Sequence, residues 1–378
     1  MIFLINSIIA SALLGIVLIN SHPLYADSSL KNQPIKYVIF AGGGGYRLWP
    51  LSSPERPKQF IPFLNSDSLL KQTIKRIAPV TKSPEDVMVV TLERYRDDIL
   101  RDVGKLTGTI VTEPMSRNTG PALLQALKNL SESGQDPVIV VLWADHFIPN
   151  QAQFLTLLEQ AVEMAIKQQS LAILGVYPTY PATGYGYIQA GDQITPGCFK
   201  VQQFHEKPNQ TAAQKYLEAG NYFWNMGIVV GKVSTFIQEF KRHAPELFTT
   251  LMQAQDMHAA YEKIIPVSID VAMLEKCKNI VVLPWAHEWY DVGNIHLFLE
   301  LHERHTPQKN NQNVISVNAF NNLVSSKKIV ACVGVSDLCI VETDNELLIV
   351  AQKDAELVKK VVESIEIQKT KNDVPKKY

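Results

Sequence analysis

Four consecutive glycines, Gly42–Gly45, stand between an apolar run and two cations in the N-terminal part of the chain. Glycine has no Cβ atom, so such a loop lets a ligand approach the main chain closely. Arg47 follows the loop and Lys58 comes eleven residues later. Successive backbone amides can bind an anion, and two nearby cations suit a polyphosphate. The pattern predicts phosphate chemistry, although a glycine run beside cations is also typical of an ordinary flexible loop.

The loop does not match two widespread phosphate-binding sequences. A P-loop that began at Gly42 would need Gly-Lys at positions 47 and 48, where Arg47 and Leu48 stand. The dinucleotide fingerprint GxGxxG fails as well, because Arg47 occupies its last position. The loop therefore predicts a phosphate cradle of another kind.

Alternating strands and helices are expected to position this loop. The apolar run 35–40 stops at the glycines, as a buried parallel strand would. Further strands are expected at 87–91, 138–142 and 171–176, with helices at 68–77, capped by Asp67, and at 151–168. We therefore expect an α/β fold with a doubly wound, mostly parallel sheet and ligands at the carboxyl ends of its strands.

The pattern changes after about residue 300. The stretches 314–317, 328–335 and 338–350 are expected to be strand-rich, and a helix is expected at 354–365. We therefore divide the chain into an apolar N-terminal segment at 1–33, an α/β domain at 34–299 and a small strand-rich domain at 300–378.

The N-terminal segment has three readings that the sequence leaves open. A secretory signal lacks its positive n-region here, since no Lys or Arg precedes Lys31. A membrane tether through residues 1–20 would have to tolerate Asn6 and Ser7. The third reading is a start codon assigned too early. Lys31 and Lys36 follow the apolar run, and this charge bias favours a cytoplasmic location for the rest of the chain.

Composition excludes some classes of protein. The formal net charge of −1 argues against a nucleic-acid binder, which usually carries a basic excess. The cysteines lack the spacing of a zinc site, so buried, reduced thiols are expected. These cysteines are Cys198, Cys277, Cys332 and Cys339.

Eight sequence blocks occur in order along the chain. They are AGGGGYRLWPLSSPERPKQF from residue 41, EPMSRNTGPAL at 113–123, VLWADHFI at 141–148, TGYGYI at 183–188, FHEKP at 204–208, YFWNMGI at 222–228, SIDVAMLEK at 268–276 and WYDVG at 289–293. Together they resemble the sugar-1-phosphate nucleotidyltransferases, and specifically the mannose-1-phosphate guanylyltransferases. The resemblance covers about residues 35–365.

The resemblance implies transfer of GMP from GTP to α-D-mannose 1-phosphate, giving GDP-mannose and pyrophosphate with the help of Mg²⁺. It implies a Rossmann-like domain followed by a domain that resembles a left-handed β-helix, in the short form without an isomerase domain. Such C-terminal domains often self-associate, so a homo-oligomer is expected. The alternatives are a nucleotidyltransferase for another sugar 1-phosphate and a catalytically silent regulatory homologue.

The resemblance also implies site residues. The catalytic cations are Arg47 and Lys58, and the metal ligands are Asp145 and Asp291. The nucleotide-binding residues are Gly42, Gly43, Gly44, Gly45, Glu113, Arg117 and Asn118. The residues for the sugar phosphate are Gly184, Tyr185, Glu206, Lys207 and Asn225. One assignment has a physical argument besides, because a carboxylate such as Glu113 accepts from both N1–H and N2–H₂ of guanine.

Purely structural roles for these residues also stay open. An aspartate after a strand is often a turn or a cap, and Glu206 beside Lys207 is also typical of a solvated charge pair. Some positions depart from the family pattern without removing a charged residue. They are Tyr46, Trp143, Met226, Tyr290 and Asn294. We expect activity to be kept, with sugar specificity less secure.

Overall fold

The computed structural model describes residues 33–306 and 313–372. The tether hypothesis for residues 1–20 therefore lies outside the described residues. Within the described ranges, no helix is both long and apolar enough to span a membrane. Apart from Gln33, the described residues belong to one compact unit, Pro34–Tyr378. The division at residue 300 stays a prediction.

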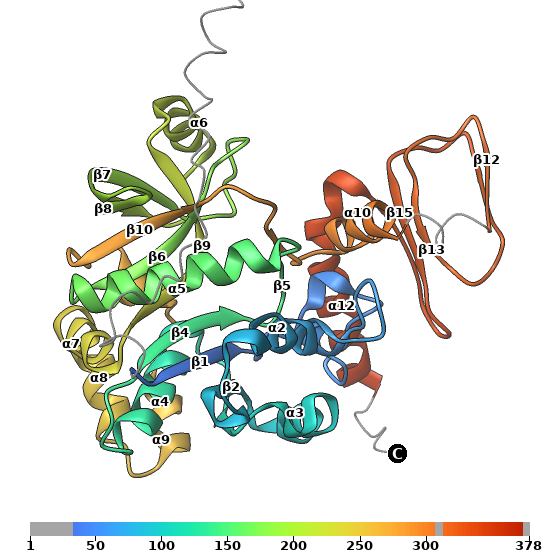
Figure 1. Cartoon of the computed structure of the whole chain (residues 1–378). Helices are drawn as coiled ribbons and strands as arrows, with labels where there is room; N and C mark the ends of the chain where they lie inside the picture. The colour runs from blue at the N-terminus through green and yellow to red at the C-terminus, as the bar shows by residue number, and fades with distance from the viewer. Residues whose placement is uncertain (1–32, 307–312, 373–378) are drawn as a thin grey trace, which may run out of the picture. The chain divides into compact units, whose positions relative to one another are not determined.

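A nine-stranded sheet with the order β3-β2-β1-β4-β9-β6-β10-β8-β7 forms the centre of the fold (Figure 1). The strands are β1 (Ile35–Phe40), β2 (Val87–Leu92), β3 (Thr109–Glu113), β4 (Val138–Trp143), β6 (Leu171–Val176), β7 (Tyr187–Thr195), β8 (Cys198–His205), β9 (Tyr222–Lys232) and β10 (Ile280–Trp285). Strands β1 to β4 pair in parallel, as do β6 and β10, whereas β9 lies antiparallel between β4 and β6. The expected mostly parallel sheet is confirmed.

Helices cover both faces of this sheet because alternate strand residues point to opposite sides. Tyr37 and Ile39 of β1 lie in one buried cluster, and Val38 and Phe40 lie in another. The first face is covered by α2 (Leu69–Ile77), α3 (Arg96–Val103) and α5 (Gln151–Lys167). The second is covered by α4 (Thr119–Ser131), α7 (Val233–His243), α8 (Pro245–Met252) and α9 (Met257–Lys263). The expected double winding is confirmed.

The remaining elements of the α/β part lie near the site. They are α6 (Gln210–Ala219), α10 (Ile295–His305) and a two-stranded sheet of β5 (His146–Phe147) and β11 (Tyr290–Asp291). The β5–β11 sheet is antiparallel and sets His146 opposite Asp291. This pairing brings together segments that are far apart in the sequence.

The C-terminal region contains short strands in stacked turns. They are β12 (Val314–Val317), β13 (Leu323–Ser325), β14 (Val330–Val333), β15 (Leu338–Glu342) and β16 (Leu347–Ala351), followed by the 3-10 helix η8 (Gln352–Leu357) and α12 (Val358–Asn372). Val314 pairs with Val330 and Leu323 with Cys339, both in parallel and both 16 residues apart. This repeat confirms the β-helix-like domain.

The segment 338–350, which was expected to be strand-rich, is a hairpin of β15 and β16 because the chain turns at Thr343, whose N–H donates to the Glu346 carbonyl at 2.9 Å. One local expectation was wrong. Helix α2 is capped by Ser68, whose Oγ accepts from Lys71 N at 3.0 Å, whereas Asp67 pairs with Lys75 at 2.6 Å. The prediction for the cysteines is confirmed, since all four are buried free thiols.

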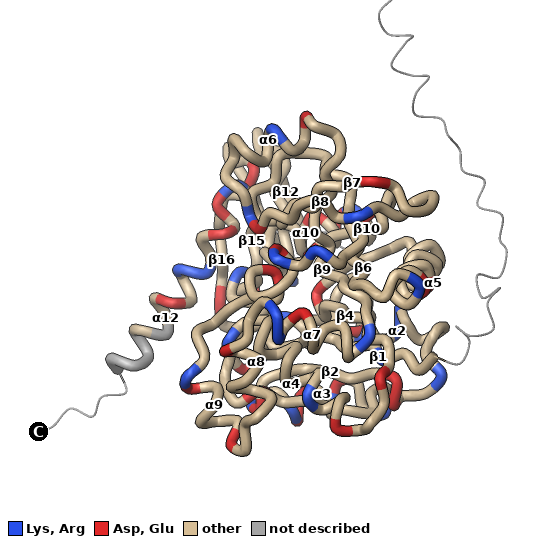
Figure 2. The backbone as a smooth tube through the Cα atoms, turned by 90° about the vertical axis from the view of Figure 1, so that its left-hand side faces the viewer, with Lys and Arg blue, Asp and Glu red and all other residues tan. Residues whose placement is uncertain are grey.

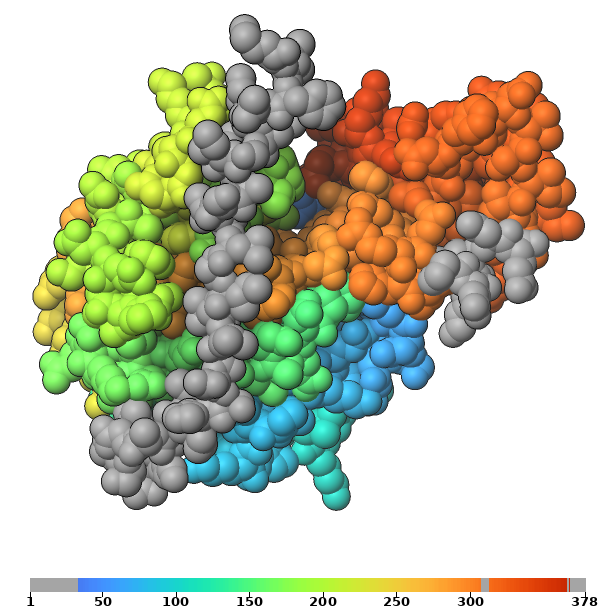
Figure 3. Space-filling view, turned by 45° about the horizontal axis from the view of Figure 1, so that its top comes forward, coloured from blue at the N-terminus to red at the C-terminus, as the bar shows by residue number. Residues whose placement is uncertain are grey.

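The C-terminal region and the N-terminal part of the α/β domain share a buried cluster. Leu48 and Phe63 pack in it with Phe298, Cys339 and Val341. In Figure 3 the orange C-terminal surface adjoins the blue surface near the N-terminus of the described chain. Contacts of this kind place the segment after the glycine loop against residues from the far end of the sequence.

Candidate active site

Two adjoining cavities lie where the parallel strands β1, β3 and β4 end. The glycine-side cavity, which includes Gly42 and Glu113, has a volume of about 600 Å³. The Lys207-side cavity, which includes Lys207 and Asn225, has a volume of about 530 Å³. The residues that line both cavities are Asn118, Thr119, Trp143, Asp145 and Pro266. Two ligands bound side by side would therefore meet near Asp145.

The glycine loop contributes in two different ways. Gly42 and Gly43 line the glycine-side cavity, so their main chain is open to a ligand there. Gly45 has φ 69°, and a Cβ atom at this position would lie 2.5 Å from Cβ of Lys58. Glycine at 45 is needed for the turn and for close packing against Lys58, rather than for contact with a ligand. Gly44 is outside the described lining of both cavities.

Lys58 begins a short 3-10 helix, η2 (Lys58–Phe60), that lies against the loop. Gln59 Nε2 donates to the carbonyl of Ala41 at 2.8 Å and fixes this helix to the end of β1. The Lys58 ammonium forms an ion pair with Asp145. Burial lowers the pKa of Lys58, but the nearby carboxylates of Asp145 and Asp291 outweigh it and raise the pKa overall. The site therefore holds a fixed positive charge.

Asp145 and Asp291, which were predicted to be metal ligands, lie at the paired strands β5 and β11. Val292 N donates to the Asp145 carbonyl at 3.0 Å, which ties the two segments together. Burial and the adjacent Asp145 raise the pKa of Asp291 to about 6. Burial opposes ionisation of Asp145 too, but Lys58 holds the pKa of that carboxyl below its usual value.

The carboxylate pair fits a hard divalent cation. Asp291 Oδ1 is buried and accepts no hydrogen bond from any described residue, so one ligand oxygen is free. The described residues hold no group of three or more His, Cys, Asp or Glu side chains suited to a metal. A cation here would complete its shell with phosphate oxygens and water, as Mg²⁺ commonly does.

Arg47 also lines the glycine-side cavity. It lies in the 3-10 helix η1 (Tyr46–Leu48), and its Nη1 donates to Glu356 Oε2 at 2.5 Å. Figure 2 shows Lys and Arg interspersed with Asp and Glu along the described chain, so the positive charge that meets an anion comes from individual side chains near the site and not from a broad basic surface. Arg47 and Lys58 are the cations that an anion entering this cavity would meet.

Glu113 ends β3 and is buried in the wall of the glycine-side cavity. Tyr261 O–H donates to Glu113 Oε1 at 3.1 Å, while Oε2 lies 3.9 Å from the Cβ position at Gly42. Burial raises the pKa of Glu113 to about 8, although the Tyr261 hydrogen bond opposes the shift. A ligand with N–H donors could bind Oε2 of Glu113, and its hydrogen bonds would favour the ionised form of this carboxyl.

Asn118 and Arg117, the two other residues predicted to bind the nucleotide, differ in their position relative to the cavities. Asn118 lines both cavities and caps α4, with Oδ1 accepting from Thr119 N at 2.8 Å. Arg117 is outside the described lining of both cavities, and its Nε donates to the Tyr261 carbonyl at 2.8 Å. Arg117 therefore supports the C-terminal end of α9, which carries Tyr261, the partner of Glu113.

All five residues predicted for the sugar phosphate line the Lys207-side cavity. They are Gly184, Tyr185, Glu206, Lys207 and Asn225. Lys207 Nζ donates to Glu206 Oε1 at 2.8 Å. A Cβ atom at Gly186 would lie 2.7 Å from Glu206 Oε2, so glycine there leaves room for this carboxylate.

Sequence reasoning missed Asp270 in this cavity. Asn225 Nδ2 donates to Asp270 Oδ1 at 2.9 Å, and Asn225 Oδ1 accepts from Gly227 N at 2.8 Å. Burial and the charge of Glu206 raise the pKa of Asp270 to about 6. It begins a π-helix, Asp270–Leu274, an irregularity that often marks a functional site. The block SIDVAMLEK was the available signal, but it did not identify which residue of the block faces a ligand.

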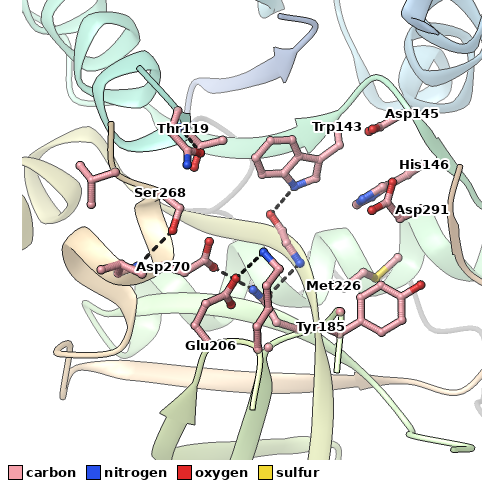
Figure 4. A pocket seen from close by; sticks show the side chains of 18 of the residues that line it. Thr119, Trp143, Asp145, His146, Tyr185, Glu206, Met226, Ser268, Asp270 and Asp291 are labelled. Atoms are coloured by element: carbon pink, nitrogen blue, oxygen red, sulfur yellow. Dashed lines mark hydrogen bonds and ion pairs between the residues drawn. The ribbon is translucent and has the colours of Figure 1, made fainter. Parts of the chain in front are cut away.

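Trp143 and His146 are two further residues near the carboxylates that sequence reasoning did not assign. Trp143 lies between the cavities, and its Nε1 donates to the Gly227 carbonyl at 2.7 Å. His146 is buried, burial lowers its pKa to about 4, and its Nδ1 accepts from Trp289 Nε1 at 3.3 Å. Figure 4 shows Asp145 and Asp291 across the Lys207-side cavity from Asp270.

Comparison with known families gives two consecutive matches. Residues 36–308 match the model of the nucleotidyl transferase family. Residues 312–365 match the model of the mannose-phosphate isomerase/GMP-like β-helix domain.

Individual proteins give matches over most of the chain. A relative from Vibrio cholerae, named putative mannose-1-phosphate guanylyltransferase, is 35% identical over 88% of this chain and 74% of its own length. Mannose-1-phosphate guanylyltransferase 2 of Escherichia coli O157:H7 is 32% identical over 90% of this chain and 75% of its own length. A crystal structure from Thermus thermophilus, described as a mannose-1-phosphate geranyltransferase, is 29% identical. It covers 88% of this chain and 99% of its own, with a TM-score of 0.79.

Proposed function

The chain belongs to the nucleotidyl transferases, among the mannose-1-phosphate guanylyltransferases, and from this membership we propose that it makes GDP-mannose. A phosphate oxygen of mannose 1-phosphate attacks the α-phosphorus of GTP. The bond from this phosphorus to the oxygen bridging to the β-phosphate breaks, and pyrophosphate leaves. The observation that carries the proposal is the pair of cavities that share Asp145, one lined by the cations Arg47 and Lys58 and the other by Lys207.

GTP is assigned to the glycine-side cavity. The amides of Gly42 and Gly43 face the phosphates, and Gly44 and Gly45 shape the turn that presents them. Arg47 and Lys58 neutralise charge that develops on the leaving pyrophosphate. Transfer of this kind depends on positioning and charge stabilisation more than on covalent chemistry by the protein.

Guanine is assigned to the wall formed by Glu113. An ionised carboxylate accepts from N1–H and N2–H₂, and no other common base offers this pair of donors on one edge. Tyr261 orients the carboxylate through its hydroxyl, and Arg117 holds the Tyr261 backbone. Asn118, which faces both cavities, is placed to contact the nucleotide.

Mannose 1-phosphate is assigned to the Lys207-side cavity. Lys207 binds its phosphate, while Glu206, Asn225 and Asp270 bind ring hydroxyls. Carboxylates and amides at fixed geometry are the usual readers of hydroxyl positions, because an unpaired buried partner is costly. Gly184 and Tyr185 form the wall beside them.

Asp145 and Asp291 would hold Mg²⁺. When bound there, Mg²⁺ would neutralise phosphate charge near the reacting phosphorus. The two residues bring the negative charge that such an ion needs, and Lys58 balances that charge when the site has no ion. Removal of divalent ions with a chelator should therefore stop turnover without unfolding the chain.

We place the active site in the cytoplasm, because GTP and mannose 1-phosphate are cytosolic metabolites.

We further propose self-association through the C-terminal domain. Its paired strands β12 and β14 expose Ile315, Val317 and Val333, each more than half accessible, on adjoining turns. Light scattering of the chain with and without Val317→Glu tests this interface, and equal masses would contradict it.

The decisive experiment is an assay of purified residues 34–378 against a panel of nucleoside triphosphates and sugar 1-phosphates. Formation of GDP-mannose with Mg²⁺, faster than any other pairing, is the expected result. Preference for another sugar 1-phosphate would reassign the substrate. Nucleotide-sugar binding without turnover by any pair would support the silent homologue instead.

A further inference from the structure

Arg47, the arginine that follows the glycine loop, is held by Glu356 from the C-terminal region of the chain. Glu356 belongs to η8, and its Oε2 accepts from Arg47 Nη1 at 2.5 Å across a sequence separation of 309 residues. Both side chains are partly exposed, with accessible fractions of 42% for Arg47 and 57% for Glu356. Exposed ion pairs contribute little to stability, so the consequence of this contact lies in where it holds the guanidinium.

A second donor fixes the Glu356 carboxylate. Asn294 Nδ2 donates to Glu356 Oε1 at 2.7 Å. Asn294 is itself held, because its Oδ1 accepts from Leu297 N at 3.0 Å as the N-cap of α10. Arg47 and Asn294 both donate, so the group between them must accept at both oxygens. Only a carboxylate does this, since an amide would turn an NH₂ toward one of the donors.

Both segments rest on one core. Leu48, next to Arg47, is buried in the same cluster as Ala355 and Val358, which flank Glu356. Val292, close to Asn294, is buried there too. Arg47, Asn294 and Glu356 therefore project from backbone that is packed together, and the contact is set by the core beneath it.

The pairing leaves part of the guanidinium free for a ligand. Arginine has five N–H donors in a rigid fork, and Glu356 uses only one edge of it. Nη2 lies 3.5 Å from the Cβ position at Gly293, and Asp291 Oδ1 lies 3.7 Å from the same point. The second edge, which carries Nη2, therefore lies on the side of Gly293 and Asp291. Burial disfavours ionisation of Glu356, but the hydrogen bonds from Arg47 and Asn294 keep its pKa below the usual value.

We infer that Glu356 is a positioning residue for Arg47, so that the C-terminal region completes the nucleotide site of the α/β domain. Glu356 touches no substrate; it orients the guanidinium so that the remaining donors meet the GTP phosphates. The inference rests on the proposed function, because it assigns Arg47 to these phosphates.

Steady-state kinetics of Glu356→Gln test the inference. The amide has the shape of the native side chain but accepts from only one of the two donors. We expect kcat/KM for GTP to fall about three- to tenfold, as for loss of one charge-assisted hydrogen bond. The KM for mannose 1-phosphate should stay within about twofold, because Lys207 and Asn225 are untouched. Glu363→Gln in α12, whose carboxylate lies 3.6 Å from the Lys359 ammonium, is the matched control and should behave as wild type.

A double-mutant cycle separates positioning from general damage. In an Arg47→Ala background, Glu356→Gln should change kcat/KM for GTP by less than about twofold, since the residue it positions is gone. Equal losses in both backgrounds, or no loss in the single variant, would overturn the inference. Asn294→Asp keeps the helix cap and gives the introduced amide an acceptor, so the pair Asn294→Asp with Glu356→Gln should recover part of the loss. A wild-type chain that forms no GDP-mannose would instead contradict the proposed function.

Discussion

The two cavities differ in how far their charged side chains are exposed to solvent. On the glycine side Lys58 and Asp145 are enclosed, with accessible fractions of 16% and 15%, and they pair with each other, whereas Arg47 is partly exposed. On the other side the Lys207 side chain is 61% accessible and pairs with its neighbour Glu206. The nucleotide side is therefore preorganised before a ligand binds, whereas the cation of the sugar side remains solvated.

Preorganisation makes charge on the glycine side costly to disturb. A buried cation without its partner destabilises the fold, because low dielectric surroundings penalise an unpaired charge. A solvated cation loses little when its partner is removed. Substitution of Lys58 or Asp145 should thus affect both stability and turnover, and substitution of Lys207 should affect turnover alone.

The largest effect is expected from the carboxylate pair. Asp145→Ala and Asp291→Ala should each lower kcat by about 100-fold, because charge stabilisation at the reacting phosphorus is lost. The rate of pyrophosphate release measures this, with exposed Asp192→Ala as the control. A variant that keeps more than about a third of wild-type turnover would remove that residue from the metal site.

Stability should separate these two variants. Asp145→Ala leaves Lys58 unpaired and should lower the free energy of unfolding by about 2–4 kcal/mol. Asp291→Ala removes a carboxyl that Asp145 repels, so its stability should be unchanged or higher. Chemical denaturation measures both, and equal destabilisation would contradict the charge arrangement described for Lys58, Asp145 and Asp291.

The next largest effect is expected from Glu113, which is proposed to recognise guanine. Glu113→Gln keeps the shape of the side chain but presents an NH₂ group to the donors of guanine. We expect kcat/KM for GTP to fall by about 1–3 kcal/mol, while the value for ATP does not fall. The ratio of the two nucleotides is the measurement. Equal losses for GTP and ATP would show that Glu113 does not read the base.

A smaller, purely kinetic effect is expected on the sugar side. Lys207→Ala should raise the KM for mannose 1-phosphate about tenfold, because one charge-assisted contact to phosphate is lost. Its melting temperature should stay within about 1 °C of wild type, since the side chain is exposed. A fall in melting temperature comparable to that of Asp145→Ala would abolish the contrast between the two cavities.

The last effect, which leaves turnover aside, is a dependence of stability on pH. The pKa of Glu113 in the folded chain is about 8, above the ordinary value of 4.5. The folded state therefore binds the proton more tightly, and this contribution is complete below about pH 4.5 and lost as pH rises through 8. Between about pH 5 and pH 8 the unliganded chain should lose roughly 1–3 kcal/mol more stability than Glu113→Gln. Parallel curves for the two proteins would show that Glu113 is not buried as described.

Much of the framework could be predicted from local patterns. The bounds of β1, β6 and β12 match the apolar runs that predicted them, because a strand buried in a sheet needs a continuous apolar segment. The antiparallel strand β9 was not predicted, since its partners β4 and β6 lie far along the chain. The pair β7 and β8 was also not predicted, although these neighbouring strands form a hairpin around the turn signal Pro196-Gly197.

The sequence by itself determined the glycine turn, the order of the family blocks and the types of residue available for phosphate, metal and sugar. These features depend on neighbours within a few positions. Only the tertiary structure decided that Tyr261 holds Glu113, that Asp270 faces Asn225 and that Glu356 holds Arg47, over 148, 45 and 309 residues. It also decided which carboxyls keep their protons, because burial and charge at close range set a pKa, and both arise from packing between distant segments.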